Sequence, residues 1–268
     1  MEDQRLQEAI DGAGAYEELH VPALFEEWTS RVLDAAQVGS GHRVLDVACG
    51  TGVLSRGAAE RVGGDGVVTG VDPNAGMLTV ARRLSGGIHW EEGVAEDLPG
   101  EDGSFDRVVS QFGMMFFTDR SAAVEEMLRV LVPGGRLAVA VWDSLENTPA
   151  YARAVDLLDR MAGPDAANAL RAPFVMGDRA ELEQLFRDAG AQDIEATTPV
   201  GRARFPSLHA MMEADLRGWL PVMGVVLPED LILAILSQAE EDLAEFVTPA
   251  GRAEFSSPAH IVSGRKAG

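Results

Sequence analysis

One glycine-rich segment constrains the fold of this chain more than any other. Residues 44–52 read Val-Leu-Asp-Val-Ala-Cys-Gly-Thr-Gly. Apolar residues around Asp46 predict a buried strand, and Gly50-Thr51-Gly52 predicts a tight turn into a helix. Glycines let a ligand approach the backbone closely, and the free N–H groups of a helix start attract negative charge. The segment therefore predicts a strand, turn and helix of a parallel α/β sheet, with a ligand site at the turn.

Strand-like and helical segments alternate over the first 142 residues. Runs rich in apolar and β-branched residues predict strands at 43–47, 67–71, 88–91, 106–110 and 136–142. Helical periodicity lies between them at 53–61, 75–84 and 121–131. Because crossovers between parallel strands are right-handed, these helices would cover both faces of a Rossmann-like, doubly wound sheet.

The segments outside this alternation are expected to be mostly helical. An amphipathic helix is predicted at 21–37 with Pro22 in its first turn, and Pro133-Gly134-Gly135 is expected to end one helix before the fifth strand starts. Beyond Trp142 the pattern predicts helices at 149–161, 178–189 and through 207–246, and strands at 193–197 and 259–263. The expected sheet therefore has seven strands.

Charge and composition exclude several classes of partner. The chain carries 22 basic and 43 acidic residues, a net charge of −21 that would repel a phosphate backbone, so no nucleic-acid partner is expected. No apolar run reaches the length of about 18 residues that a bilayer span needs, and the first residues lack a signal-peptide pattern, so we expect a cytoplasmic protein. The single cysteine, Cys49, excludes an internal disulfide, and no metal site is expected.

A second acid marks the end of the next predicted strand. Asp72 follows that strand and would lie beside the glycine turn. Its carboxylate could bind both hydroxyls of a ribose, or it could cap the helix that begins near Asn74. A dinucleotide fingerprint requires a third glycine where this chain has Ser55, which disfavours a nucleotide-dependent oxidoreductase.

Five ordered blocks carry a more specific signal. They are VLDVACGTG at 44–52, GVDPNAGML at 70–78, AEDLP at 95–99, SFDRVVSQFG at 104–113 and RVLVPGGRL at 129–137. Together they resemble class I S-adenosylmethionine-dependent methyltransferases, and within them the small-molecule group of ubiquinone and menaquinone biosynthesis enzymes. The resemblance implies S-adenosylmethionine as cofactor, S-adenosylhomocysteine as product and a small-molecule acceptor, which apolar residues near 114–117 suggest is hydrophobic or aromatic.

The resemblance also implies which residues hold the cofactor. Asp46 would orient its amino group, and Asp72 would bind the ribose hydroxyls. Its methionine and ribose parts would be lined by Ala48, Gly50, Thr51 and Gly52. The adenine would be contacted by Pro73, Met77, Ala95 and Glu96, and the transferable methyl would be faced by Ser110 and Gln111.

Two departures from the family pattern bear on this assignment. Val94 stands where relatives often carry Asp or Asn, so Glu96, Asp97 or the backbone would have to hold the adenine amine. Gln111-Phe112-Gly113 replaces the Asn-Pro-Pro-Tyr or Asp-Pro-Pro-Tyr block, which disfavours methylation of nucleic-acid bases.

The C-terminal half is less specific. We expect residues 1–206 and 247–268 to form the methyltransferase core and residues 207–246 to form a helical cap over the acceptor pocket. The Met-rich side chains of this stretch could line that pocket or only fill gaps in a packed appendage. The same two interpretations apply to Met114-Met115-Phe116-Phe117.

A catalytic base is needed only if the acceptor must lose a proton. The candidates by sequence are Tyr16, His20, His209, Glu213 and Asp215. The two histidines, His20 and His209, are the preferred choices, although either could be a surface residue.

Three functions remain open on sequence grounds. The first is methyl transfer to a small organic acceptor. The second is a scaffold that binds the same cofactor but catalyses another reaction or none, since the cofactor residues are common to both. The third, a nucleotide-dependent oxidoreductase, has least support. The sequence contains no information on the oligomeric state.

Overall fold

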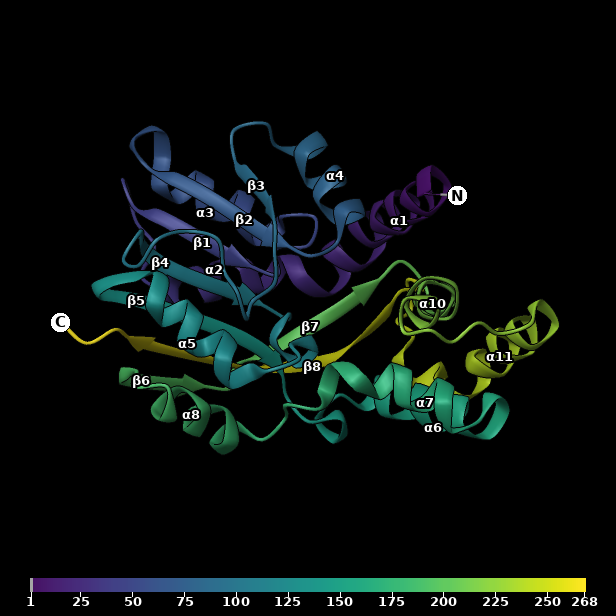
Figure 1. Cartoon of the computed structure of the whole chain (residues 1–268). Helices are drawn as coiled ribbons and strands as arrows, with labels where there is room; N and C mark the ends of the chain where they lie inside the picture. The colour runs from purple at the N-terminus through teal and green to yellow at the C-terminus, as the bar shows by residue number, and fades with distance from the viewer. Residues whose placement is uncertain (1) are drawn as a thin grey trace.

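The computed structural model describes residues 2–268, so only Met1 lies outside it (Figure 1). Its central sheet has the strand order β3-β2-β1-β4-β5-β8-β6. Strands β1 to β5 are parallel, and β8 is antiparallel to both β5 and β6. The strands span Arg43–Val47 (β1), Val67–Asp72 (β2), His89–Glu92 (β3), Phe105–Gln111 (β4), Leu131–Trp142 (β5), Gln192–Thr197 (β6) and Ala253–Arg265 (β8). The predicted doubly wound fold is confirmed.

Strand β1 occupies the centre of the sheet, and the chain order reverses beside it. Val44, Leu45 and Val47 are buried, as expected for a parallel strand covered on both faces. Strand β2 pairs with one edge of β1 and β4 with the other. Such a reversal leaves a crevice at the carboxyl ends of the strands, which is where ligands bind in open α/β sheets.

Helices cover both faces of this sheet. Helix α2 lies beside α3 behind the sheet, and α5 lies beside α8 in front of it (Figure 1). Three of the helices that cover the sheet, α4, α5 and α8, start where an Asn or Asp side chain accepts hydrogen bonds from the first free amides, as Asn74, Asp119 and Asp178 do, whereas α3 starts at Gly52 without a side-chain cap. Their bounds are Val53–Val62 (α3), Ala75–Leu84 (α4), Arg120–Val130 (α5) and Arg179–Asp188 (α8).

The N-terminal helix is longer than predicted. Helix α1 spans Glu2–Ala15, continues as a π-helical segment at Tyr16–Phe25 and ends as α2 at Glu26–Ala35. The prediction that Pro22 starts the helix is wrong, because Pro22 lies inside the π-helical segment. A proline lacks the N–H that an interior turn uses, and the wider π turn accommodates that loss.

The turn at Pro133-Gly134-Gly135 also lies differently from the prediction. Helix α5 ends at Val130 and β5 begins at Leu131, so the turn falls within β5 and not before it. The pairing with β4 jumps there from Leu131 to Arg136, and Gly134 has a φ of 77°. The extra residues form an irregularity near the start of the strand, where a glycine tolerates positive φ.

The C-terminal half adds helices and an eighth strand. Strand β7, Val200–Phe205, was not predicted and pairs with residues 253–258 of β8, whereas residues 259–265 of β8 pair with β5. The helices gather at the end of the sheet toward which β4 points (Figure 1). They span Pro149–Ala162 (α6), Pro164–Arg171 (α7), Leu208–Glu213 (α9), Leu220–Val222 (α10) and Glu229–Asp242 (α11), with a second π-helical segment at Ala214–Trp219.

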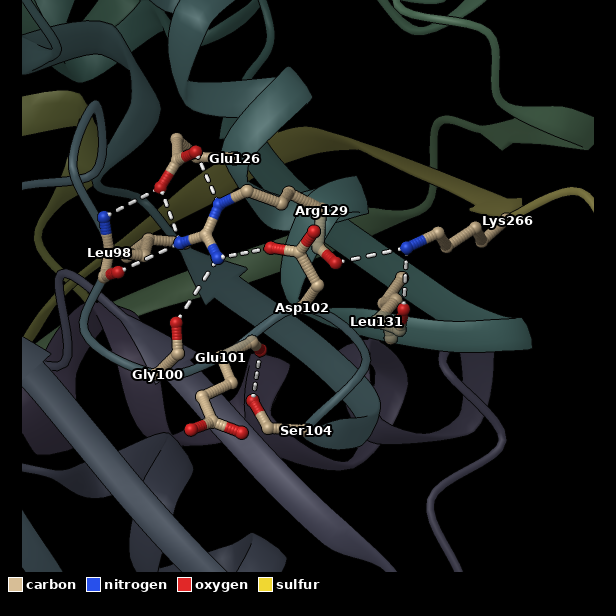
Figure 2. A network of polar contacts seen from close by, with 9 residues as sticks. All are labelled: Leu98, Gly100, Glu101, Asp102, Ser104, Glu126, Arg129, Leu131 and Lys266. Atoms are coloured by element: carbon tan, nitrogen blue, oxygen red, sulfur yellow. Dashed lines mark hydrogen bonds and ion pairs between the residues drawn. The ribbon is translucent and has the colours of Figure 1, made fainter.

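An arginine network fixes the loop that leads into β4. Figure 2 shows the Arg129 guanidinium donating to both carboxylate oxygens of Glu126, to Asp102 and to the carbonyls of Leu98 and Gly100. The amide of Leu98 in turn donates to Glu126. The loop that carries residues 95–96 is therefore held from its C-terminal side.

The end of the chain is fixed in the same region. Lys266 follows β8 and donates through Nζ to the carbonyl oxygens of Arg129 and Leu131, at 2.9 and 2.8 Å (Figure 2). Among residues 2–268, no helix combines the length and the apolar character that crossing a membrane requires.

Candidate functional site

Two adjoining cavities lie at the carboxyl ends of the parallel strands. The first, which we call the large cavity, measures about 480 Å³ and is lined by the glycine turn, the ends of β1, β2 and β4, and the loop at 93–96. The second, the aromatic cavity, measures about 110 Å³ and lies between the first π-helical segment, Trp142 of β5 and the helices of the C-terminal half. Both cavities are lined by Tyr16, Phe25, Phe112, Phe116 and Trp219.

Asp72 holds the glycine turn in place. One carboxylate oxygen accepts a hydrogen bond from the Gly50 amide at 2.9 Å, and the other accepts one from the Asn74 amide at 2.8 Å. Burial raises the pKa of Asp72, and these two amides oppose that effect. The helix α4 is capped by Asn74 itself, which accepts from the amides of Gly76 and Met77. The alternative that Asp72 caps this helix is therefore wrong.

Asp46 is held from one side only. Its Oδ2 accepts a hydrogen bond from Ser55 Oγ at 2.5 Å, and within the described residues Oδ1 has no partner. Burial raises the pKa of Asp46 to about 7, and the nearby Asp72 adds to this shift. Ser55 is fully buried, and its hydrogen bond orients Asp46. In the sequence, Ser55 was noted only because it stands where a dinucleotide fingerprint would have a third glycine.

Several buried polar atoms near the turn lack partners. Across residues 2–268, no hydrogen bond is formed by Asp46 Oδ1, Thr51 Oγ1, Ser110 Oγ or Gln111 Oε1. Unpaired buried polar atoms are costly, and a polar ligand in the large cavity would satisfy them. Asp46, Thr51 and Gln111 line this cavity, whereas Ser110 is completely buried and does not.

The remaining predicted cofactor residues divide into two groups. The large cavity is lined by Ala48, Gly50, Pro73, Met77, Ala95 and Glu96. Gly52 does not line it. At a φ of 89° Gly52 starts α3, and a Cβ there would lie 2.3 Å from the Trp90 ring, so a turn and a close contact require this glycine.

Glu96 has a local partner that the sequence did not reveal. Its Oε1 accepts hydrogen bonds from the amides of Thr118 and Asp119, at 2.7 and 3.1 Å. This carboxylate thus ties the loop after β3 to the start of α5. Val94, the departure from the family pattern, lines the cavity beside it.

The walls of the aromatic cavity come from distant parts of the chain. Its aromatic lining consists of Tyr16, Phe25, Phe112, Phe116, Trp142, Tyr151, Phe174 and Trp219. The rings of Phe112 and Trp142 stack at 3.7 Å between centroids. Of the segment at 114–117, Met114 and Met115 are buried in the core, whereas Phe116 and Phe117 line the cavities. Sequence analysis identified few of these residues, although both tyrosines of the chain are among them.

The candidate bases are separated by the structure. His20 and Asp215 both line the aromatic cavity, with His20 Nε2 at 3.7 Å from Asp215 Oδ1, and Tyr16 lies there too. His209 is half exposed, lines neither cavity and lies beside Glu213 on the surface of α9. The structure therefore brings His20, Tyr16 and Asp215 together and leaves His209 and Glu213 outside the site.

The fold and the site define a class of enzyme. A doubly wound sheet has a polar cavity at its switch point, and an aromatic cavity suited to an apolar molecule adjoins it. These features are typical of Rossmann-like enzymes that bring a nucleoside-containing cofactor to a second substrate.

Comparisons with known proteins give the family. A family model described as "Methyltransferase domain" matches residues 44–135. The ubiquinone/menaquinone biosynthesis C-methyltransferase UbiE of Chromobacterium violaceum is 38% identical over 190 residues, which are 62% of this chain and 74% of that protein. The demethylmenaquinone methyltransferase of Staphylococcus saprophyticus is 31% identical over 206 residues, 70% of this chain and 88% of that protein.

A solved structure shares the fold. The phosphoethanolamine N-methyltransferase 2 of Haemonchus contortus, in complex with phosphomonomethylethanolamine and S-adenosylhomocysteine, matches with a TM-score of 0.60 at 18% identity, over 97% of this chain and 58% of that one. The chain belongs to the class I S-adenosylmethionine-dependent methyltransferases, and S-adenosylmethionine is its cofactor.

Proposed function

We propose that this enzyme transfers the methyl group to a small, apolar and aromatic acceptor of quinone-like chemistry that binds in the aromatic cavity. The observation that carries the proposal is the shared wall between the two cavities. A flat ring in the aromatic cavity would lie directly beside a cofactor in the large one. The names of the bacterial relatives, which are quinone methyltransferases, support the same class of acceptor.

The residues of the large cavity fit the cofactor. We infer that Asp46 Oδ1 accepts from its amino group and that Asp72 faces its ribose, because both carboxylates are buried beside the turn and Asp46 lacks a second partner. The rest of the proposed set is Ala48, Gly50, Thr51, Gly52, Pro73, Met77, Ala95, Glu96, Ser110 and Gln111. Gly52 and Ser110 do not line the cavity. We infer that Gly52 acts by shaping the turn and that Ser110 acts through its polar group at the end of β4.

The chain's contribution to catalysis is mainly orientation. S-adenosylmethionine, when bound, supplies an electrophilic methyl group on a sulfonium. The protein has to hold the acceptor in line with it and exclude water, and orientation of this kind can contribute about 7 to 11 kcal/mol at best. The stacked rings of Phe112 and Trp142 would offer the acceptor a flat apolar surface that orients its ring.

We also propose that residues 207–246 form a cap over the acceptor pocket, with residues 1–206 and 247–268 as the core. This stretch lies between β7 and β8 and contributes Asp215 and Trp219 to the aromatic cavity. Removal of the cap would leave one side of that cavity open to water.

Calorimetric titration tests the proposed cofactor site first. S-adenosylmethionine and S-adenosylhomocysteine should bind in the micromolar range and NADH should not. The protein is then incubated with S-adenosylmethionine and 1,4-dihydroxynaphthalene, and a methylated product is sought by mass spectrometry. Product formation would support the proposed reaction. Cofactor binding without a product from this hydroquinone or from reduced short-chain demethylmenaquinone would favour a binding scaffold.

A further inference from the structure

The two π-helical segments meet at the aromatic cavity. The first, Tyr16–Phe25, follows α1, and the second, Ala214–Trp219, lies in the proposed cap. They pack against each other although nearly two hundred residues separate them. π-helical turns are rare and occur frequently at functional sites. His20 comes from the first segment and Asp215 from the second.

The His20 ring is held in a defined orientation. It stacks on Tyr16 at 5.7 Å between centroids and meets Phe205 edge to face at 6.4 Å. Its Nε2 lies 3.7 Å from Asp215 Oδ1, a distance that suits an ion pair and is long for a hydrogen bond. Catalytic hydrogen bonds are often this long before substrate binds.

The other two polar atoms of this pair are unused. Within residues 2–268, His20 Nδ1 and Asp215 Oδ2 are buried and have no hydrogen-bond partner. A carboxylate beside Nε2 favours the tautomer with its proton on Nε2 and leaves a lone pair on Nδ1. The imidazole therefore has an unpartnered, buried nitrogen on a residue that lines the aromatic cavity.

We propose that His20 accepts the proton that the acceptor loses during methyl transfer and that Asp215 positions His20 for this step. The inference rests on the proposed function and extends it, because it assigns a catalytic residue and a positioning residue to the acceptor side. The two residues also come from different parts of the chain, because His20 belongs to the proposed core and Asp215 to the proposed cap.

The proton and electron balance is simple. The acceptor's hydroxyl gives its proton to Nδ1 of His20, and the electron pair left behind forms the new bond to the methyl carbon, through oxygen or through a conjugated ring carbon. The bond between that carbon and the sulfonium sulfur breaks, and its electron pair stays on sulfur. After carbon attack, the ring proton moves to the oxygen. In either case His20 ends as an imidazolium beside Asp215, which stabilises the positive charge.

Four titratable groups line the aromatic cavity: His20, Asp215, Tyr16 and Tyr151. Burial raises the pKa values of both tyrosines above their ordinary range, so they stay neutral and cannot replace the base. Burial also raises the pKa of Asp215, and the neighbouring His20 opposes that shift. His20 and Asp215 are therefore the groups of this cavity, among the described residues, that can take up the proton.

Substitutions test the proposal with 1,4-dihydroxynaphthalene as acceptor. We expect His20→Gln to lower kcat by about a hundredfold or more, the range typical of a lost general base, with cofactor affinity unchanged by calorimetry. Asp215→Asn should lower kcat by about tenfold and move the acidic limb of the pH profile to lower pH, because the imidazolium loses its stabilising charge. Asp215→Glu should restore most of the rate.

The surface pair His209 and Glu213 provides a matched control. Its Nε2 to carboxylate distance is also 3.7 Å, but it lies outside both cavities. We expect His209→Gln to change neither kcat nor the pH profile. If His20→Gln behaves like His209→Gln, or if Asp215→Asn leaves the pH profile in place, the proposal is wrong.

Imidazole NMR tests the pair without any catalysis. A two-bond proton–nitrogen correlation on the free, nitrogen-labelled protein should show His20 with its proton on Nε2, and Asp215→Asn should reduce that preference. A proton on Nδ1 in the wild type would overturn the proposal. If the wild type methylates no acceptor but shows the expected tautomer, the proposed reaction fails whereas the positioning by Asp215 stands.

Discussion

The two cavities of this enzyme differ in how they are built. The large cavity is formed mostly by a tight turn, strand ends and loops within residues 46–118, and its key contacts are hydrogen bonds to backbone amides. The aromatic cavity is formed by side chains from both ends of the chain, and ring packing holds it together. Outside the rings that both cavities share, a change in the large cavity should therefore affect cofactor binding, and a change in the aromatic cavity should affect acceptor binding.

The strongest test of this contrast is Asp72→Ala. It removes the acceptor of the Gly50 and Asn74 amides, and hydrogen bonds to a charged group contribute about 1.5 to 3 kcal/mol each. We expect the affinity for S-adenosylmethionine to fall by about a hundredfold or more in calorimetry. Asp178→Ala is the matched control, because Asp178 also accepts from two amides but lies at the start of α8. Unchanged affinity in Asp72→Ala would contradict the assignment.

The next test exploits the pH dependence of Asp46. A carboxyl group titrates near pH 4 in an unfolded chain, whereas the pKa of Asp46 in the folded chain is about 7. Between these values the folded protein holds one more proton than the unfolded one, so Asp46 lowers the free energy of unfolding as the pH rises from about 4 to about 7.

Asp46→Asn should remove this contribution. In chemical denaturation without cofactor, the variant should gain stability relative to wild type as the pH rises, reaching about 4 kcal/mol at pH 8. It should also bind S-adenosylmethionine more weakly, because the amide carries no charge. Ser55→Ala should act in the opposite direction on stability, since the Ser55 hydrogen bond lowers the pKa of Asp46. If the stability of Asp46→Asn follows the wild-type pH dependence, the pKa of Asp46 is not raised in the folded protein.

A third substitution addresses the aromatic cavity alone. Phe174 lines it, packs against Tyr151 at 5.6 Å and does not line the large cavity. Phe174→Leu should raise the KM for the acceptor by about tenfold, since an aromatic contact and some buried area are lost. Cofactor affinity should stay the same. A matching loss of cofactor affinity would mean that the two cavities respond as one.

The smallest expected effect is at the connection between the two regions. Arg56 of α3 donates to the Thr51 carbonyl and pairs with Glu17 of the first π-helical segment at 2.6 Å. Arg56→Gln should weaken cofactor binding by about two- to fivefold, because partly exposed ion pairs contribute about 1 kcal/mol or less. Arg61→Gln, which removes another cross-helix pair, with Asp34, should have no such effect.

Local signals predicted the large cavity well. Helix α4 lies at the residues expected, because its capping Asn74 and its periodicity are both local. The same holds for β1 and the glycine turn, whose residue types are required by the turn itself. The role of Ser55 was missed, since nothing in its neighbours shows that it contacts Asp46.

Long-range packing explains most of what was not predicted. Strand β7 alternates exposed and buried residues, but its arginines and glycine hid the pattern, and β8 contains Pro258 at the point where its pairing changes from β7 to β5. The His20 and Asp215 pair depends on two π-helical segments that no sequence periodicity marks. Its members were candidates by residue type, but their proximity was not predictable.

The wall that the two cavities share has a thermodynamic consequence. Tyr16, Phe25, Phe112, Phe116 and Trp219 border both cavities, so a molecule in either one fixes side chains that form the other. Such coupling is reciprocal in free energy: whatever factor the cofactor contributes to acceptor affinity, the acceptor contributes to cofactor affinity. We therefore expect substitution of one of these five rings to change the coupling between the two affinities, by the same factor in both directions.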